Sequence, residues 1–491
     1  MDTIASSIIA LAMLLFGLGK DTVPEPSDQL KVILERLEAG GDPPSVVLDL
    51  KELADEGDAD AQFAMGLWLQ RGIGVTPSLA DSVAYYRMAV EQGHVVATNN
   101  LGFLLLAAGG QNPEVRQEGV ELLRKAMAAG SKEARRNLAV LHVEGVAVER
   151  DLEQARALLE QGIEAGDPEA AIVLSQLWEG AHGHEQDQEK ALKLLRDAAT
   201  AGSPLAMNQL GQRFFNGTGV EQDVAKARIF FERSAAADDA VGMRSLAAMY
   251  EGGIGVEANQ TQAIELYAKA AEAGDGVAQH KMGNLAEAGA EGVEKSDTEA
   301  LRWYRLAAAS GLPSATYNIG VFYEQGRVVD ADLEKAFAFY LNSAENGLAL
   351  AQHKVGLYYL NGAGVNRDVV AAAAWFDRAA GAGLADSQVF LGNMFESGIG
   401  VPQNLETSYR LFEMAARQGH PDGWIKLATY HYQGLGVEQD MVKAYAAAKR
   451  AEQAGAEVAE QLEALAGELT EGQIAEAEKL AEELLKEAEA E

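Results

Sequence analysis

The chain has 491 residues, and 40 Lys and Arg against 74 Asp and Glu give it a net charge of −34 at pH 7. An acid excess of this size argues against nucleic acid and anionic membrane surfaces as partners, because binding to either needs clustered Lys and Arg. The sequence contains no cysteine, which excludes disulfides, thiol catalysis and cysteine zinc sites and leaves the redox compartment open.

The first feature in chain order is an uncharged apolar run at residues 4–18, IASSIIALAMLLFGL. It is short for a membrane span, which needs about 20 residues, and fits a signal-peptide core of about 7 to 15. Residues 1–19 are therefore predicted to direct export to the periplasm or the cell exterior. No Lys or Arg precedes the run and Asp2 has the wrong sign, so a membrane anchor formed by residues 4–18 and a helix packed on the fold stay open. Membrane contact is expected only through this segment.

Residues 20–56 are predicted to hold a linker and two capping helices. Pro24 and Pro26 make the start of this segment extended. Helical patterns follow over residues 28–38 and 45–56. The second pattern ends like the repeated unit described next, so it is interpreted as a half-unit that covers the first full one.

Residues 351–383 form the best-preserved copy of a unit with two short helices. Gly362 and Gly364 can take the positive φ values that close a turn between the helices, and Asp368 can cap the second helix. Gly356 is a small residue among apolar ones in the first helix. It predicts that the backbone of a neighbouring helix comes close at this point.

Three markers of this unit recur at steps of 36 or 37 residues, except that the cap series has no member in the second unit. The small residue of the first helix recurs at Gly66, Gly102, Ala139, Ser175, Gly211, Ala247, Gly283, Gly320, Gly356, Gly392 and Ala428. The cap of the second helix recurs at Ser78, Asp151, Asp187, Asp223, Asn259, Ser296, Asp332, Asp368, Asn404 and Asp440. The closing residue recurs at Gly93, Gly130, Gly166, Gly202, Asp238, Gly274, Gly311, Gly347, Gly383, Gly419 and Gly455.

Such a period predicts an all-α fold, a right-handed α-α superhelix (solenoid) of about eleven 36-residue helix-turn-helix repeats over residues 57–455. Three units depart from the pattern in their turns, at residues 107–113, 179–184 and 326–329, where altered loops and intact helices are expected. Residues 456–491 are predicted to form two acidic capping helices with one apolar stripe.

The combination LG-x-x-Y, G-x-G-V, D-x-x-x-A, W/Y-F/Y and A-A-x-x-G resembles the Sel-one-like repeat (SLR) family, α-solenoid relatives of the tetratricopeptide repeat proteins. It is plain in Gly211 with residues 217–220 (GTGV), and in residues 253–256 (GIGV) with Tyr267. The resemblance covers roughly residues 57–455. It implies an adaptor, because this family is chiefly known for adaptors in signalling, envelope and host-contact processes.

Catalytic motifs are absent from the sequence. The recurring G-x-G-V lies between two helices, so it is a turn and not a phosphate cradle. His182 and His184, with Glu179 and Glu185 beside them, have the composition of a metal site, but a wet surface loop is the expected state, and no metal or cofactor is predicted. Three residues after the small marker runs an aromatic ladder, which is expected to be core between units: Trp178, Phe214, Tyr250, Tyr323, Tyr359 and Phe395.

A second line, two and three residues before the small marker, contains no acid and is termed the polar ladder. If the first helices line the concave face, it forms a neutral-to-basic groove that binds a partner. The alternative is that these polar groups bond to adjacent backbone and only orient the helices. The predicted partner-binding residues are Asn100, Arg136, Asn137, Asn208, Gln209, Arg244, His280, Lys281, Asn318, His353, Lys354 and Lys426.

The sequence therefore predicts a scaffold or adaptor, and no enzyme, that is exported or membrane-tethered and holds a protein or peptide segment on its concave face. Two alternatives stay open. One is a hydrolase of the kind associated with some secreted SLR proteins, although this chain lacks their cysteines. The other is a structural envelope protein that self-associates.

Overall fold

The computed structural model describes residues 27–38, 43–71, 75, 78–108, 112–180, 186–290 and 292–490. Regular structure in these ranges is helical, apart from an isolated bridge between Ala290 and Val293. The chain divides into two compact units, Met1–Lys295 and Ser296–Glu491. The predicted export segment, residues 1–19, lies outside the described residues. Within them, every helix is too short or too polar to span a membrane.

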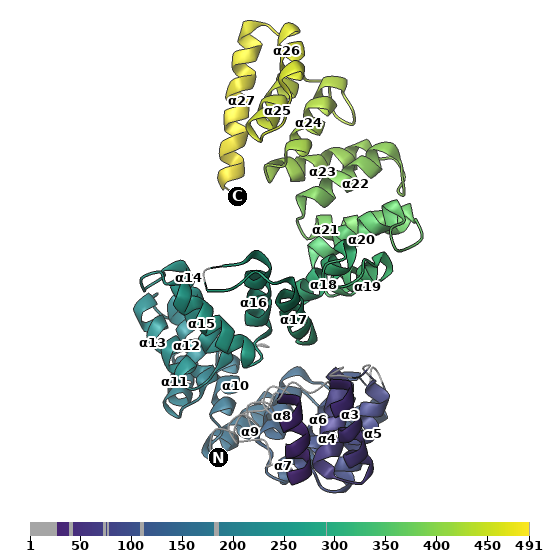
Figure 1. The fold of residues 1–491 in the computed structure, drawn as a ribbon. Helices are drawn as coiled ribbons and strands as arrows, with labels where there is room; N and C mark the ends of the chain where they lie inside the picture. The colour runs from purple at the N-terminus through teal and green to yellow at the C-terminus, as the bar shows by residue number, and fades with distance from the viewer. Residues whose placement is uncertain are drawn as a thin grey trace. The chain divides into compact units, whose positions relative to one another are not determined.

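The first unit is built from antiparallel pairs of helices (Figure 1). Its helices are α2 (Asp28–Glu38), α3 (Pro43–Asp55), α4 (Ala59–Arg71), α5 (Leu79–Glu91), α6 (Val95–Ala108), α7 (Pro113–Ala128), α8 (Lys132–Glu144), α9 (Leu152–Glu164), α10 (Pro168–Trp178), α11 (Gln188–Thr200), α12 (Pro204–Asn216), α13 (Val224–Ala236), α14 (Ala240–Gly252), α15 (Gln260–Glu272) and α16 (Gly276–Ala288).

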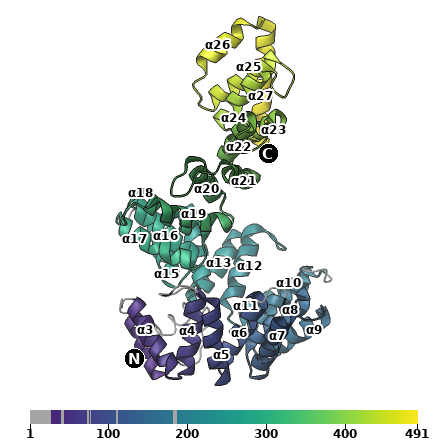
Figure 2. The same ribbon diagram turned by 90° about the vertical axis from the view of Figure 1, so that its right-hand side faces the viewer.

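The second unit continues the same pairing of helices (Figure 2). Its helices are α17 (Asp297–Ala309), α18 (Pro313–Gln325), α19 (Leu333–Glu345), α20 (Ala349–Asn361), α21 (Val369–Gly381), α22 (Ala385–Ser397), α23 (Leu405–Arg417), α24 (Pro421–Gln433), α25 (Met441–Gln453), α26 (Ala459–Gly467) and α27 (Glu471–Ala490).

The predicted solenoid of about eleven helix-turn-helix repeats is confirmed. The predicted cap and closing residues also begin and end the helices as expected. Each of the ten predicted cap residues accepts a hydrogen bond from a backbone N–H in the first turn of its helix. All eleven closing residues have positive φ, including Asp238 at 59°. The helix ends are therefore set by local backbone chemistry.

The turn between the helices also joins one repeat to the next. Gly362 and Gly364 have φ of 71° and 63°, as predicted. A Cβ on Gly364 would clash with the carbonyl of Leu333, the first residue of α19 in the preceding repeat. Two features therefore require glycine at position 364, its positive φ and the close approach of this carbonyl group.

The prediction that Gly356 makes room for the backbone of a neighbouring helix is wrong. A Cβ on Gly356 would lie 2.7 Å from Cε1 of Phe376, a fully buried ring on the second helix of the same repeat. The glycine makes room for an aromatic side chain, not for a neighbouring backbone. Gly102 is different, because its Cβ would lie 2.9 Å from the carbonyl oxygen of Gly119.

Helices flank all three irregular turns, as expected. In the turn at residues 326–329, Val328 takes a left-handed φ of 66° where most repeats have glycine, and α18 and α19 keep their full length. Parts of the other two turns, residues 109–111 and 181–185, lie outside the described ranges.

Further helices pack at both ends of the repeats. Leu30 and Leu34 of α2 and Leu50 of α3 are buried in one cluster with the first repeat. At the other end α27 lies along α25 (Figure 1), where Ala477 and Ala481 are buried. The acidic face of α27 is left outward, as expected of a terminal helix.

Candidate functional site

The first helices of consecutive repeats line the inner side of the first unit. Helix α6 contacts α8, α10 contacts α12, and α12 contacts α14. The second helices of the same repeats approach one another less closely. Helices on the shorter radius of a curved stack come closer together, so the polar ladder lies on the concave side here.

Each cation of the polar ladder forms an ion pair within the chain. Arg136 contacts Asp167 at 2.6 Å and Glu169 at 3.0 Å, and Arg244 contacts Asp275 at 2.9 Å. The acids cap or begin the first helix of the following repeat. These arginines therefore join consecutive repeats.

The three lysines of the ladder pair with the preceding repeat. Each contacts a glutamate thirty residues earlier, four positions after that repeat's small marker. The pairs are Lys281 with Glu251 at 2.6 Å, Lys354 with Glu324 at 3.0 Å and Lys426 with Glu396 at 2.5 Å.

A tyrosine completes two of these contacts. Tyr267 Oη donates to Glu251 at 2.9 Å, and Tyr340 Oη donates to Glu324 at 2.8 Å. Burial alone would raise the pKa of Glu324, but hydrogen bonds from Lys354 and from tyrosine hydroxyls bring it below its usual value. Burial, together with the glutamate, raises the pKa of Tyr340. The carboxylate is therefore charged and the tyrosine protonated at neutral pH.

Neutral members of the ladder also contact neighbouring repeats. Asn137 Nδ2 donates to Asn99 Oδ1 at 3.0 Å, and Asn208 Nδ2 donates to Ser245 Oγ at 3.2 Å. His353 Nδ1 lies 2.8 Å from Ser387 Oγ. Burial lowers the pKa of His353, so the ring is neutral at pH 7.

The remaining residues of the polar ladder also lie on first helices of repeats: α6, α12, α16 and α18. Asn100 Oδ1 accepts a hydrogen bond from Asn99 at 3.1 Å, and burial lowers the pKa of His280. Gln209 lies on α12 and Asn318 on α18. Partner binding by the ladder stays a prediction. The alternative was that these side chains only orient the helices by bonding to adjacent backbone. The observed contacts do join helices, but their partners are side chains of neighbouring repeats and not backbone groups.

The aromatic ladder packs between repeats, as expected. Trp178 and Phe214 are buried, and Tyr359 packs against the cores around both Tyr358 and Phe376. Lysines from the second helices cover three of the rings, Trp178, Phe214 and Tyr323, with Lys190 Nζ 4.2 Å from the centre of Trp178.

An open groove of about 540 Å³ crosses the inner side of the first unit, between α12, α14 and α16. It contains two polar-ladder residues, Arg244 and Lys281, which are already paired with acids. It also exposes 40% of Ile254 and 47% of Val277. The sequence reasoning missed these apolar members, because it selected groove residues by polarity.

Within the described residues, no group of three or more His, Asp or Glu side chains is placed to hold a metal ion. His182 and His184, which have the composition of a metal site but for which no metal is predicted, lie outside those residues.

These features define an α-solenoid repeat protein with an open inner surface. The Sel1 repeat family model matches eleven segments, and the chain therefore belongs to the Sel1 repeat family. Proteins of this family typically serve as protein-interaction scaffolds, and their fold is typically non-catalytic. The segments are residues 59–94, 95–131, 132–167, 168–203, 204–239, 240–275, 276–312, 313–348, 349–384, 385–420 and 425–453.

Solved structures include similar proteins from bacteria. A protective antigen with an SLR fold from uropathogenic Escherichia coli strains shares 30% identity over 90% of this chain and 95% of its own, with a TM-score of 0.58. A Sel1 repeat protein from Oxalobacter formigenes shares 32% identity over 47% of this chain and 94% of its own, with a TM-score of 0.45. No curated protein matches the chain.

Proposed function

We propose that the chain is a non-catalytic scaffold that holds an extended peptide segment of a partner protein in the groove between α12, α14 and α16. The observation that carries the proposal is the pairing of exposed Ile254 and Val277 with polar side chains in one open groove on the inner side. Membership of a family of interaction scaffolds supports it.

The groove favours a segment with little charge. Asp275 neutralises Arg244 and Glu251 neutralises Lys281, so neither cation is left to attract an acidic partner. Polar side chains such as Gln212 and Ser245 offer hydrogen bonds to peptide backbone, while the apolar side chains offer contact area. An apolar and polar segment without charged residues fits these features.

A displayed peptide library tests the proposal. Selection on the purified chain should enrich uncharged peptides that bind with a one-to-one stoichiometry. Val277→Glu should abolish their binding, because it places a charge on the groove wall. Leu350→Glu is the matched control: Leu350 has the same register in its own repeat and is 52% exposed, but it does not line the groove. Equal binding by both variants would refute the assignment.

We further propose that residues 1–19 export the chain. The apolar run at residues 4–18 supports this, as does the description of the Escherichia coli relative as a protective antigen. Expression with a C-terminal tag in a Gram-negative host, followed by fractionation and intact mass measurement, tests it. A periplasmic or secreted product that lacks about 19 residues is expected, and Leu14→Arg should block its appearance. A full-length product in the membrane fraction would instead indicate the anchor.

A further inference from the structure

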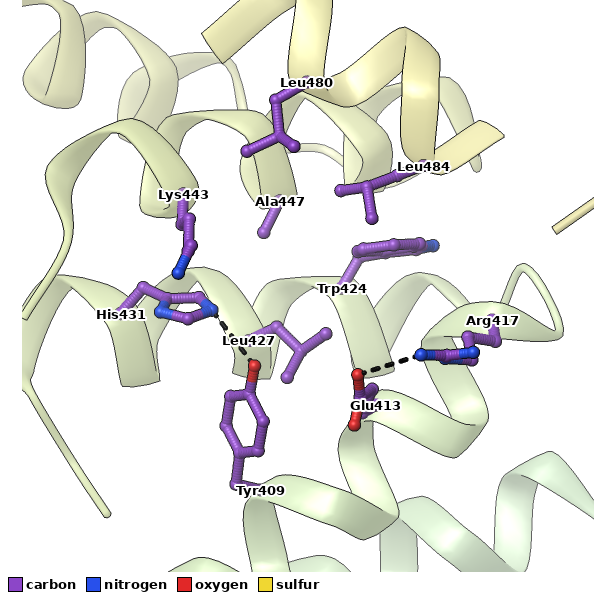
Figure 3. Close-up of a pocket in the computed structure, with 10 residues that line it drawn as sticks. All are labelled: Tyr409, Glu413, Arg417, Trp424, Leu427, His431, Lys443, Ala447, Leu480 and Leu484. Atoms are coloured by element: carbon purple, nitrogen blue, oxygen red, sulfur yellow. Dashed lines mark hydrogen bonds and ion pairs between the residues drawn. The ribbon is translucent and has the colours of Figure 1, made fainter. Parts of the chain in front are cut away.

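A pocket of about 190 Å³ lies beneath α27, at the last repeat (Figure 3). Helices α23, α24, α25 and α27 surround it. Two partly exposed cations lie at its opposite ends, Lys443 with a side chain that is 56% exposed and Arg417 with one that is 52% exposed. Its lining residues are Tyr409, Glu413, Arg417, Trp424, Leu427, His431, Lys443, Ala447, Leu480 and Leu484.

The other repeats explain why there is space here. The seventh residue after the cap of the second helix is large and apolar in nine repeats, but it is Ala447 in the last. At this position Leu158, Trp303 and Leu411 are buried. The nine large residues are Tyr85, Leu158, Leu194, Phe230, Leu266, Trp303, Phe339, Trp375 and Leu411.

The register position of Trp424 varies among the repeats. Four repeats have glutamine at this register position, and its side-chain amide donates to a backbone carbonyl of the preceding helix, as from Gln388 to Ala380 at 3.3 Å. The last repeat has tryptophan, which is 3% exposed and whose Nε1 has no hydrogen-bond partner among the described residues. The exchange forfeits a buried hydrogen bond and adds a flat apolar wall.

His431 takes the aromatic-ladder position, where the third repeat also has a histidine, His142. His431 is 8% exposed, and its Nε2 lies 3.2 Å from Tyr409 Oη. Its Nδ1 is buried without a hydrogen-bond partner in the described part of the chain. Leaving such a nitrogen unpaired costs stability, and a phenyl ring would avoid that cost. Packing alone therefore does not explain the histidine.

Close packing of α27 accounts for only part of this pattern. Ala444, Ala448 and Ala451 of α25 are also buried, so small residues let other helices approach α25. Ala447, another small residue of α25, also allows this close approach. This explanation still leaves an unfilled space against Leu480 and Leu484, and it gives no reason for a polar ring in its wall.

Groups that can meet an anion gather at the end of the pocket next to Lys443. Glu413 is neutralised by Arg417 at 3.3 Å. Lys443, the Tyr409 hydroxyl and His431 gather at the other end, as Figure 3 shows. Asp440 lies 3.5 Å from Lys443 Nζ, and because both side chains are partly exposed this pair is weak enough for an anion in the pocket to compete for the lysine.

We propose that this pocket binds a small organic carboxylate whose apolar body is a single ring or a short branched chain. A cavity of roughly 150 Å³ accommodates benzene, so the observed space suits one such group. The body would lie between Trp424 and the leucines of α27, and the carboxylate would meet Lys443 and the Tyr409 hydroxyl. This inference does not rest on the peptide groove of the first unit.

Isothermal titration calorimetry of the full chain with phenylacetate tests the proposal, alongside phenylacetamide and phenethylamine. Phenylacetate should bind one-to-one, the uncharged amide more weakly, and the amine least. The shared chemistry also occurs at the C-terminus of a peptide. An acetylated peptide ending in phenylalanine that binds while phenylacetate does not would overturn the small-molecule assignment.

Variants locate the site. Ala447→Leu installs the residue type of the other repeats and should abolish binding, and Ala447→Val should weaken it with less risk to the packing of α27. Lys443→Gln should weaken phenylacetate binding about three- to fivefold, the range for a partly exposed ion pair, and leave the amide unaffected. Lys335→Gln is the matched control, since Lys335 has the same register and covers Tyr323. Unchanged phenylacetate binding in both Ala447 variants would overturn the proposal.

Discussion

Removing the contact between Lys354 and Glu324 is expected to uncouple two neighbouring repeats without unfolding either. Both side chains are only 26% exposed, and Tyr340 adds a third hydrogen-bonding group. Exposed ion pairs contribute at most about 1 kcal/mol, whereas breaking a fully buried pair costs about 3–5 kcal/mol. We therefore expect this pair to have a coupling free energy of about 1–2 kcal/mol.

A double-mutant cycle with Lys354→Met and Glu324→Gln measures that coupling in urea unfolding. Stability in a solenoid is roughly a sum over repeats and their interfaces, so hydrogen exchange should accelerate in α18 to α20 and not in α24. The pair between Lys335 and Asp332 is the matched control. Its atoms are 3.1 Å apart, but its side chains are 62% and 31% exposed, and we expect a much weaker coupling than for Lys354 and Glu324. Equal coupling in both pairs would refute the reasoning.

The pH dependence of the cycle gives an independent check. Burial opposes ionisation of Glu324, but its hydrogen bonds prevail and hold the pKa below the ordinary value of 4.5. A carboxylate with a lowered pKa stabilises the fold fully above its unfolded pKa and loses this contribution as the pH falls through the folded value. The coupling should therefore be constant between pH 7 and about 5 and disappear in stronger acid. A coupling that changes between pH 7 and 6 would contradict the assignment to Glu324.

Two further sets of substitutions and one titration separate local effects. Gly364→Ala should destabilise the protein more than Gly383→Ala in urea unfolding, because both positions have positive φ but only Gly364 faces a backbone carbonyl; left-handed strain alone costs about 1–2 kcal/mol, and equal losses would refute the contact. Gly356→Ala should cost about 1–3 kcal/mol by crowding Phe376, and adding Phe376→Leu should recover part of the loss if the ring is the obstacle. The NMR titration of His353 should have its midpoint below 6.5, so that stability present above pH 6.5 falls as the ring is forced to protonate; a midpoint above 6.5 would contradict its burial.

The helix boundaries were predictable because each depends on the backbone of a few adjacent residues. Asp368 caps its helix through its own first turn, and Gly383 closes it through its own φ. Even Asp238, the one closing residue that is not glycine, was predictable, since Asp tolerates the left-handed region. Val328 was not, because a β-branched residue rarely takes positive φ.

Contacts between repeats were harder to predict, because they join residues about thirty positions apart. The polar ladder was selected by reading one register position along the chain, which hides the partner of each lysine. A usable signal exists: Lys281, Lys354 and Lys426 each have glutamate thirty residues earlier. Reading two register positions together would have shown that the ladder's positive charge is compensated within the fold.

The contact at Gly356 was misassigned for a similar reason. A small residue indicates that something comes close, but it does not identify what does. The residue twenty positions later supplies the answer, since glycine faces an aromatic ring at Gly211 with Phe231 and at Gly392 with Phe412. The marker and the ring therefore form one packing pair.

The repeats themselves act as controls for distinguishing architecture from function. A residue type that recurs at one register is explained by stacking, as the three lysine and glutamate pairs are. A residue that weakens packing needs another reason, and His431 is one: its buried Nδ1 has no hydrogen-bond partner in the described part of the chain, whereas Nδ1 of His142, at the same register, lies 3.2 Å from the carbonyl oxygen of Glu149. The inner groove and the pocket under α27 use different residues from different compact units. Val277→Glu and Ala447→Leu therefore test them separately, and a protein that loses peptide binding in one variant and carboxylate binding in the other would have two independent sites on one scaffold.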